Sequence, residues 1–233
     1  MSEKTLSSAQ ARRLYDWLGA RYDWFAAFEA QAKNRLFEHL DLQPGLRLLN
    51  VGLGAGRDQQ RLQTALAPGG AAFGVDLSLA MLRSARHKSG APLCQADGER
   101  LPFAPASFDR LCCLYVLDLI AAGQIPAWLD GFRRLLRPGG RLALVSLTEG
   151  IDRPSRALVG AWKRAYALSP LACAGCRPLQ LAGLVRQAGF TGVESEIIVQ
   201  LGVPSEIVTA LAPGPSPRDE QRQRSPDAPD WTI

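Results

Sequence analysis

The feature that most constrains this chain is a glycine-rich turn between a buried strand and a helix. Residues 46–52 (LRLLNVG) are continuously apolar apart from Arg47 and Asn50, which is typical of a parallel strand buried on both faces. The strand leads into GLGAG (52–56), and a polar helical segment follows at 57–67. Glycines at these positions permit a tight turn and let a ligand approach the backbone at the N-terminus of the helix.

A second predicted strand, 71–76, ends in an acidic residue, Asp76. A carboxylate at the end of the second strand can accept hydrogen bonds from ribose hydroxyls. The loop lacks the Gly-Lys-Ser/Thr ending of a P-loop, and Arg57 stands where the dinucleotide pattern GxGxxG requires glycine. The sequence therefore favours a nucleoside ligand without a pyrophosphate, and S-adenosylmethionine meets that description.

Strands and helices alternate along most of the remaining chain. Ser78 is a plausible N-cap for the helix that follows the second strand. Further strands are expected at 91–97, 110–117, 141–148 and 193–200, and helices at 79–87, 125–136 and 179–188. This alternation predicts an α/β fold, a Rossmann-like doubly wound sheet that is mostly parallel, with helices on both faces.

The chain divides into three predicted parts. Residues 1–45 show helical periodicity with many aromatic residues and are expected to form an N-terminal helical lid. Residues 46–211 form the Rossmann-like domain, with an insertion near 150–178 that breaks the alternation. Residues 212–233 are rich in proline and charge, so a disordered tail is expected.

Composition narrows the class of protein. The chain is 47% hydrophobic, carries no apolar run long enough to span a membrane and has no visible signal peptide, so a soluble, cytoplasmic protein is expected. Its net charge of +5 would favour an anionic substrate or membrane surface but is too weak for a nucleic-acid footprint. Oligomeric state is not indicated.

One N-terminal segment combines basic and aromatic residues, namely Arg12, Arg13, Trp17, Arg21 and Trp24. Such a helix can rest on an anionic membrane surface as a peripheral contact. A solvated basic face above packed aromatic side chains explains the same pattern equally well.

Several ordered motifs between about Tyr15 and Phe190 resemble those of a known family. They are RLYDWLGARYDWF, LLNVGLGAG, GVDLSLAMLRSAR, QADGERLPFAPASFDRL and LLRPGGRLALVS. In these segments the chain resembles the class I S-adenosylmethionine-dependent methyltransferases, and within them the branch that contains ubiquinone/menaquinone C-methyltransferases and bacterial phospholipid N-methyltransferases. None of the motifs indicates which acceptor substrate is methylated.

The resemblance implies a set of residues around S-adenosylmethionine. Asp76 would hold the ribose hydroxyls, the glycine loop would approach the methionine and ribose portions, and Tyr22 would close over the sulfonium end. The implied cofactor-binding residues are Tyr22, Asn50, Gly52, Leu53, Gly54, Gly56, Asp76, Leu77, Asp97, Gly98 and Leu114.

Asn50 departs from the family pattern, which usually has Asp or Glu at this position to hold the α-amino group of the cofactor. Asparagine keeps hydrogen-bonding capacity but loses the stronger, charge-assisted component. Asp58, just after the loop, is expected to supply a nearby negative charge instead.

Methyl transfer needs alignment of donor and acceptor, and a base only where the acceptor must lose a proton. The acceptor is expected to be small or amphiphilic: a quinone-like ring, a lipid headgroup or a secondary metabolite. The candidate catalytic residues are Tyr22, Tyr115 and Asp118. Tyr115 as a core aromatic, and Asp118 as a helix cap or solvated acid, remain alternative readings.

Two other functions stay open at this point. A cofactor-binding protein without turnover is supported by Asn50 alone. Thiol or metalloid methylation would use Cys173 and Cys176, which form a lone CxxC motif, and requires several cysteines to converge on the acceptor pocket. No metal site is predicted, because zinc usually requires a second pair of ligands at matching spacing.

Overall fold

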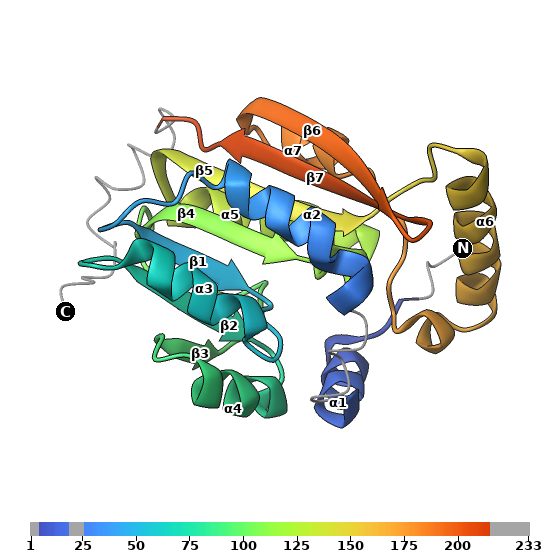
Figure 1. Ribbon diagram of the computed structural model, residues 1–233, viewed down its shortest axis with the longest axis horizontal. Helices are drawn as coiled ribbons and strands as arrows, with labels where there is room; N and C mark the ends of the chain where they lie inside the picture. Colours follow the sequence, from blue (N-terminus) through green and yellow to red (C-terminus); the bar gives the residue numbers. More distant parts are fainter. Residues whose placement is uncertain (1–4, 19–25, 215–233) are drawn as a thin grey trace.

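The computed structural model describes residues 5–18 and 26–214. Its centre is a seven-stranded sheet with the order β3-β2-β1-β4-β5-β7-β6 (Figure 1). The strands from β3 to β5 run parallel, and β7 runs antiparallel to both β5 and β6. The strands are β1 (Arg47–Val51), β2 (Ala71–Asp76), β3 (Leu93–Gln95), β4 (Phe108–Leu114), β5 (Leu136–Leu147), β6 (Thr191–Gln200) and β7 (Val203–Leu211).

Helices cover both faces of this sheet, as the sequence predicts. In Figure 1, α2 and α3 lie on one face, and α5 and α7 lie on the other. The helices are α1 (Ser8–Leu18), α2 (Ala26–His39), α3 (Arg57–Leu66), α4 (Leu79–Lys88), α5 (Ile125–Leu135), α6 (Arg153–Leu168) and α7 (Leu181–Gln187). The Rossmann-like, mostly parallel α/β fold is confirmed, and no helix in the described ranges is long and apolar enough to cross a membrane.

Each face of the sheet has its own hydrophobic core. Leu36 of α2 and Leu62 of α3 are fully buried against one face, and Phe132 of α5 is fully buried against the other. Burying a side chain of this size stabilises the fold by about 1.5–3 kcal/mol. Because both faces are covered, the strands of the parallel half read as nearly continuous apolar runs.

Two of the strands differ from the predicted elements. The fourth strand ends at Leu114 rather than 117, because Tyr115 takes a left-handed backbone conformation with φ of +53°. Strand β5 begins at Leu136, and its register against β4 breaks between Phe108 and Arg110. The Pro138-Gly139-Gly140 segment therefore lies within the strand as an irregularity instead of preceding it.

Strand β7 was not predicted. It pairs with β6 through a two-residue turn in which Leu201 and Gly202 have φ values of +52° and +83°. Positive φ at both central residues is the geometry of a tight hairpin turn, which asparagine and glycine usually supply. Because leucine occupies the first position, the sequence does not indicate this turn. The hairpin places β7 next to β5 in the sheet.

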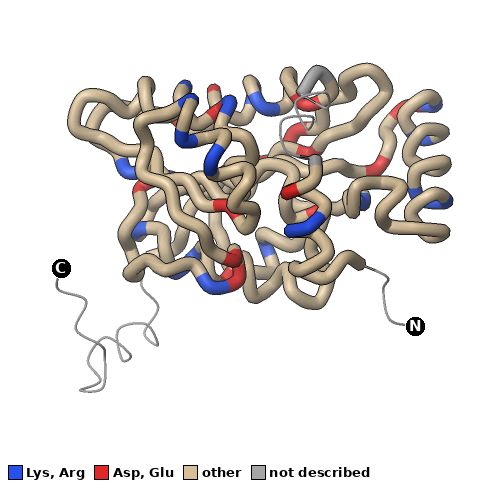
Figure 2. Tube along the Cα trace, turned by 90° about the horizontal axis from the view of Figure 1, so that it is seen from below, with Lys and Arg blue, Asp and Glu red and all other residues tan. Residues whose placement is uncertain are grey.

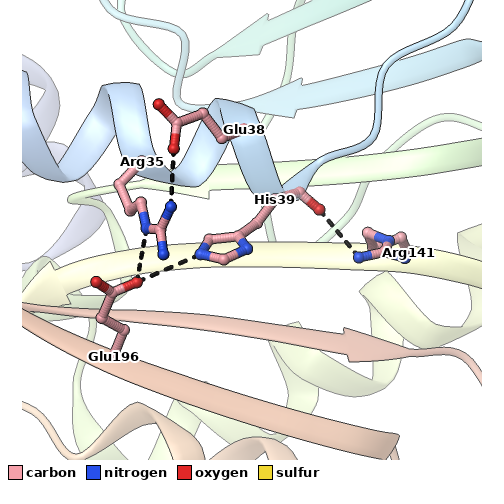
Figure 3. A network of polar contacts seen from close by, with 5 residues as sticks. All are labelled: Arg35, Glu38, His39, Arg141 and Glu196. Atoms are coloured by element: carbon pink, nitrogen blue, oxygen red, sulfur yellow. Dashed lines mark hydrogen bonds and ion pairs between the residues drawn. The ribbon is translucent and has the colours of Figure 1, made fainter.

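Helix α2 is part of the folded core. Beyond its buried apolar residues, a polar network joins its C-terminal half to the sheet (Figure 3). The Arg35 guanidinium contacts Glu196 of β6 at 2.9 Å, His39 Nε2 lies 3.3 Å from the same carboxylate, and Arg141 of β5 donates to the His39 carbonyl at 3.0 Å. The Arg35 side chain holds the pKa of Glu196 below its usual range. Exposed pairs of this kind contribute little to stability, so their main effect is to fix the orientation of α2.

Candidate functional site

A cavity opens at the carboxyl ends of β1 and β4. The chain crosses from β1 to β2 on one side and later to β4 on the other, so this is the point where the order of the sheet reverses. Ligands of open α/β sheets bind at such a point. The cavity is lined by the turn after β1, by the segments that follow β2, β3 and β4, and by residues of α1 and α2.

The three glycines of the turn serve different purposes. All have positive φ: +72° at Gly52, +59° at Gly54 and +78° at Gly56. A methyl group on Gly52 would come within 2.2 Å of Val116, and one on Gly56 within 2.4 Å of Ala85, whereas one on Gly54 would meet nothing within 4 Å. Gly52 and Gly56 therefore allow close packing, and Gly54 presents bare backbone to the cavity.

Asp76 joins the end of β2 to the glycine turn. One carboxylate oxygen accepts the Gly54 N–H at 2.9 Å, and the other accepts the Ser78 N–H at 2.8 Å. Burial raises the pKa of Asp76, while these hydrogen bonds act in the opposite direction. Each oxygen keeps a lone pair for a further donor. The position fits the predicted partner of ribose hydroxyls.

Most of the predicted cofactor-binding residues line the cavity. In addition to Asp76 it is lined by Asn50, Gly52, Leu53, Gly54, Leu77, Asp97, Gly98 and Leu114. Gly56 does not line it and packs against α4 instead. Tyr22 lies outside the described residues.

Asn50 faces the cavity with its side chain already engaged. Its amide donates to Gln59 Oε1 at 2.9 Å, and the Gln59 amide donates in turn to the Ala72 carbonyl at 2.7 Å. The Cys112 thiol lies 3.5 Å from the Asn50 carbonyl oxygen. Asn50 thus holds α3 to the sheet and carries no charge toward the cavity.

The charges at this end of the cavity come from α2 and α3. The Lys33 ammonium contacts Glu29 at 2.8 Å and Asp58 at 3.4 Å, and all three residues line the cavity. Burial lowers the pKa of Lys33, but the two carboxylates raise it by more, so the pKa lies above its ordinary value. The sequence indicated Asp58, but it gave no sign of Glu29 and Lys33, because an ion pair four residues apart is common on any helix.

The candidate catalytic residues differ in their access to the cavity. Tyr115 lines it and exchanges a hydrogen bond with Ser205 at 2.8 Å, and burial raises the pKa of its hydroxyl. Asp118 is 1% exposed and does not line it. One Asp118 oxygen accepts a long, 3.5 Å hydrogen bond from the Leu147 N–H, and burial raises the pKa of Asp118 to about 7. Tyr115 is thus in a position to contact a ligand, whereas Asp118 lies behind the residues that line the cavity.

The CxxC motif forms a turn outside the cavity. The Cys176 N–H donates to the Cys173 carbonyl at 2.9 Å, and neither cysteine lines the cavity. Burial raises the pKa of both thiols, so they are protonated near neutral pH. In the described ranges no three His, Cys, Asp or Glu side chains gather closely enough to hold a metal ion. The convergence of cysteines that metalloid methylation requires is therefore not found there.

Comparisons with known proteins show which family this chain resembles. Residues 48–140 match the family model of a methyltransferase domain. Malonyl-[acyl-carrier protein] O-methyltransferase of Erwinia pyrifoliae is 34% identical over 76% of this chain and 68% of its own length. Demethylmenaquinone methyltransferase of Corynebacterium urealyticum is 31% identical over 58% of each chain.

A solved structure extends the likeness to the fold. Phosphoethanolamine N-methyltransferase 2 of Haemonchus contortus, in complex with phosphomonomethylethanolamine and S-adenosylhomocysteine, superposes with a TM-score of 0.67. The two chains are 16% identical over 90% of this chain and 61% of the other. At this identity the likeness concerns the fold alone.

The different packing of the glycines predicts different effects of alanine. Gly56→Ala should lower the free energy of unfolding by about 3 kcal/mol, because left-handed backbone strain adds to an overlap with Ala85. Gly54→Ala should cost only about 1–2 kcal/mol but weaken binding of S-adenosylhomocysteine at least about tenfold, because the methyl group enters the cavity. Urea unfolding and titration calorimetry measure the two effects. Equal stability of the two variants, or unchanged binding by Gly54→Ala, would contradict this assignment.

The raised pKa of Asp118 predicts that the free energy of unfolding depends on pH. Between about pH 4 and 7 the unfolded chain has lost the Asp118 proton while the folded chain retains it. The free energy of unfolding should therefore fall as pH rises through this window, by on the order of a few kcal/mol, and level off above it. Asp118→Asn should lack this fall, and Asp130→Asn, on an exposed part of α5, should keep it. Parallel stability curves for the wild type and Asp118→Asn would refute the raised pKa.

Proposed function

The chain belongs to the class I S-adenosylmethionine-dependent methyltransferases, and we propose that it transfers the methyl group to an amphiphilic acceptor bound between α1, α2 and the end of β4. Its cofactor is S-adenosylmethionine, which when bound supplies a methyl group on a positively charged sulfonium. The observation that carries the proposal is that one cavity is lined both by the open glycine turn with Asp76 and by apolar and aromatic side chains of α1.

The nucleoside end of the site uses residues of the sheet. We assign the ribose hydroxyls to Asp76, whose carboxylate is already oriented by two backbone N–H groups. Leu77, Asp97 and Gly98 line the neighbouring wall and suit an adenine ring. A side chain at Gly98 would come within 2.2 Å of Trp128, so the backbone there stays bare.

The methionine end uses the charged residues of α2 and α3. An amino acid group carries both signs of charge, and Glu29, Lys33 and Asp58 offer both within one ion-paired row. We propose that Asp58 and Glu29 receive the α-amino group and that Lys33 receives the carboxylate. This row supplies the charge-assisted hydrogen bonds that Asn50 cannot make.

The acceptor end is mainly apolar. Leu6, Ala11 and Tyr15 of the N-terminal segment line it together with Tyr115, Leu119 and Ile120, which follow β4. Such walls bury a hydrocarbon or ring and exclude water, which strengthens the alignment of the reacting groups. Among the expected acceptors they favour a quinone-like ring over a small polar metabolite.

Tyr115 and Asp118 have different parts in this scheme. The raised pKa of Tyr115 keeps its hydroxyl protonated, so it orients an acceptor oxygen by hydrogen bonding rather than acting as a base. Asp118 acts as a positioning residue through its contact with Leu147 at the end of β5. The methylated ring would then release its proton to solvent on leaving the cavity, because Glu29 is already engaged by Lys33.

A transfer assay with labelled S-adenosylmethionine tests this function. We expect methylation of a short-chain demethylmenaquinone analogue and little of a malonyl thioester on acyl carrier protein. Asp58→Asn should raise KM for S-adenosylmethionine about tenfold, and Asp76→Asn by about 10–100-fold, because each loses a hydrogen bond to a charged group. Asp130→Asn, a surface change with the same loss of charge, should leave KM unchanged.

Each alternative gives a distinct result in that assay. Methylation of the malonyl thioester alone would mean that the acceptor is a carboxylate and not a ring. Cofactor binding without transfer to either acceptor would favour a protein that has kept the fold and lost turnover. An unchanged KM in Asp58→Asn would remove the ion-paired row from the cofactor site.

A further inference from the structure

Helix α6 stands apart from the rest of the molecule. It follows β5 and projects beyond the carboxyl end of the sheet, at the right of Figure 1. A capping box formed by Asp152 and Ser155 begins the helix, and the Trp162 indole N–H donates to the Cys176 carbonyl at 2.9 Å. Its inner face is Ser155, Val159, Trp162 and Tyr166, which are buried or half-buried. The opposite face is therefore presented outward.

The outward face of α6 is basic along one side. Arg153, Arg156, Lys163 and Arg164 are all exposed, and the helix contains no acidic residue. Figure 2 shows these blue segments along the helix at the right of the view. The nearby acids are Asp152, committed to the helix cap, and Glu149, which pairs with Lys163. A net positive surface remains.

The same face carries exposed apolar side chains beside the arginines. Residues 153, 157, 161, 164 and 168 are spaced three or four apart, so they lie along one side of the helix, and all are exposed. Two of them are arginines of the basic row and two are alanines, and the series ends at Leu168, which is 85% exposed, followed by Leu171 at 56%. Exposed leucines beside a basic row are typical of helices that lie in a membrane interface.

The β6–β7 hairpin adds a second apolar projection next to α6. A methyl group at Gly202 would lie 3.6 Å from Leu158 of α6, so the hairpin tip touches the helix. Leu201 occupies the tip, is 71% exposed and has a left-handed backbone that leucine adopts only at a cost. The turn accounts for this backbone conformation, whereas the exposure of so large an apolar side chain adds nothing to the fold and suits a contact outside it.

We propose that α6 and the hairpin tip form a docking surface for an anionic lipid bilayer. The basic row would lie against lipid phosphates, and Leu168, Leu171 and Leu201 would insert between the headgroups. These side chains stand on a projecting helix and a turn, a convex shape that suits insertion into a fluid interface. An acidic protein would meet the same charges but would leave the protruding leucines exposed unless it had matching pockets.

The surface lies close to the acceptor end of the cavity. Cys176, which receives the Trp162 hydrogen bond, interacts with Tyr15 of α1, and Tyr15 lines the cavity. Leu6, another lining residue, lies against Gly175 in the same turn. The helix that carries the docking surface thus contacts, through its inner face, the turn next to the apolar end of the cavity.

Vesicle sedimentation with the full chain tests this inference without any acceptor. At about 0.1 M salt the wild type should bind phosphatidylcholine vesicles containing about one-third phosphatidylglycerol, and should not bind phosphatidylcholine alone. Arg153→Gln with Arg164→Gln should weaken binding about thirtyfold, and Leu168→Ser about tenfold. Arg83→Gln with Arg86→Gln, two exposed cations of α4, is the matched control and should bind like the wild type.

Three outcomes would overturn the proposal. One is failure of the wild type to bind the anionic vesicles, including the case in which it binds a soluble acidic carrier protein instead. Another is equal loss in the α4 control, which would indicate a diffuse charge effect. The third is loss of binding in Trp17→Ala on α1 with full binding by the α6 variants. Circular dichroism on each variant shows that the fold is retained, which the exposure of these side chains predicts.

Discussion

The rest of the site depends on the hydrogen bond between the Asp76 carboxylate and the Gly54 backbone. This contact joins the end of β2 to the turn that follows β1, and it forms only because the turn adopts a left-handed backbone. The close approach of Gly52 to Val116 and of Gly56 to Ala85 holds the turn in that shape. One carboxylate therefore defines both the wall of the cavity and the position where a ribose is expected.

The second constraint is the placement of α2, which supplies charges from outside the Rossmann-like core. Its buried side chains, Leu36 and Phe37 among them, and its contacts with Glu196 and Arg141 fix the helix on the sheet, so Lys33 meets Asp58 of α3 at the cavity wall. In the proposed site, this arrangement would hold an amino acid group although Asn50 stands in place of an acid. Asn50 itself serves as a structural bridge to Gln59.

Local patterns predicted the parts of the structure that depend on neighbours in sequence. The first strand, the glycine turn, Asp76 and the Ser78 cap all appear where the residues indicate, because turn geometry and capping act over a few residues. Strand β7 was missed because leucine replaces the usual turn residue at 201. Glu29 and Lys33 were missed, and Asp118 was expected at the surface of the site, because their surroundings come from segments distant in sequence.

The central claim is that segments from α2 to β4 converge on one S-adenosylmethionine site. Hydrogen exchange with and without S-adenosylhomocysteine tests it directly. The account predicts slower exchange at 52–54, 76–78 and 97–98 together with the backbone around Glu29 and Lys33, all in the same titration. Protection of the glycine turn without α2, or no protection in any of these segments, would contradict it.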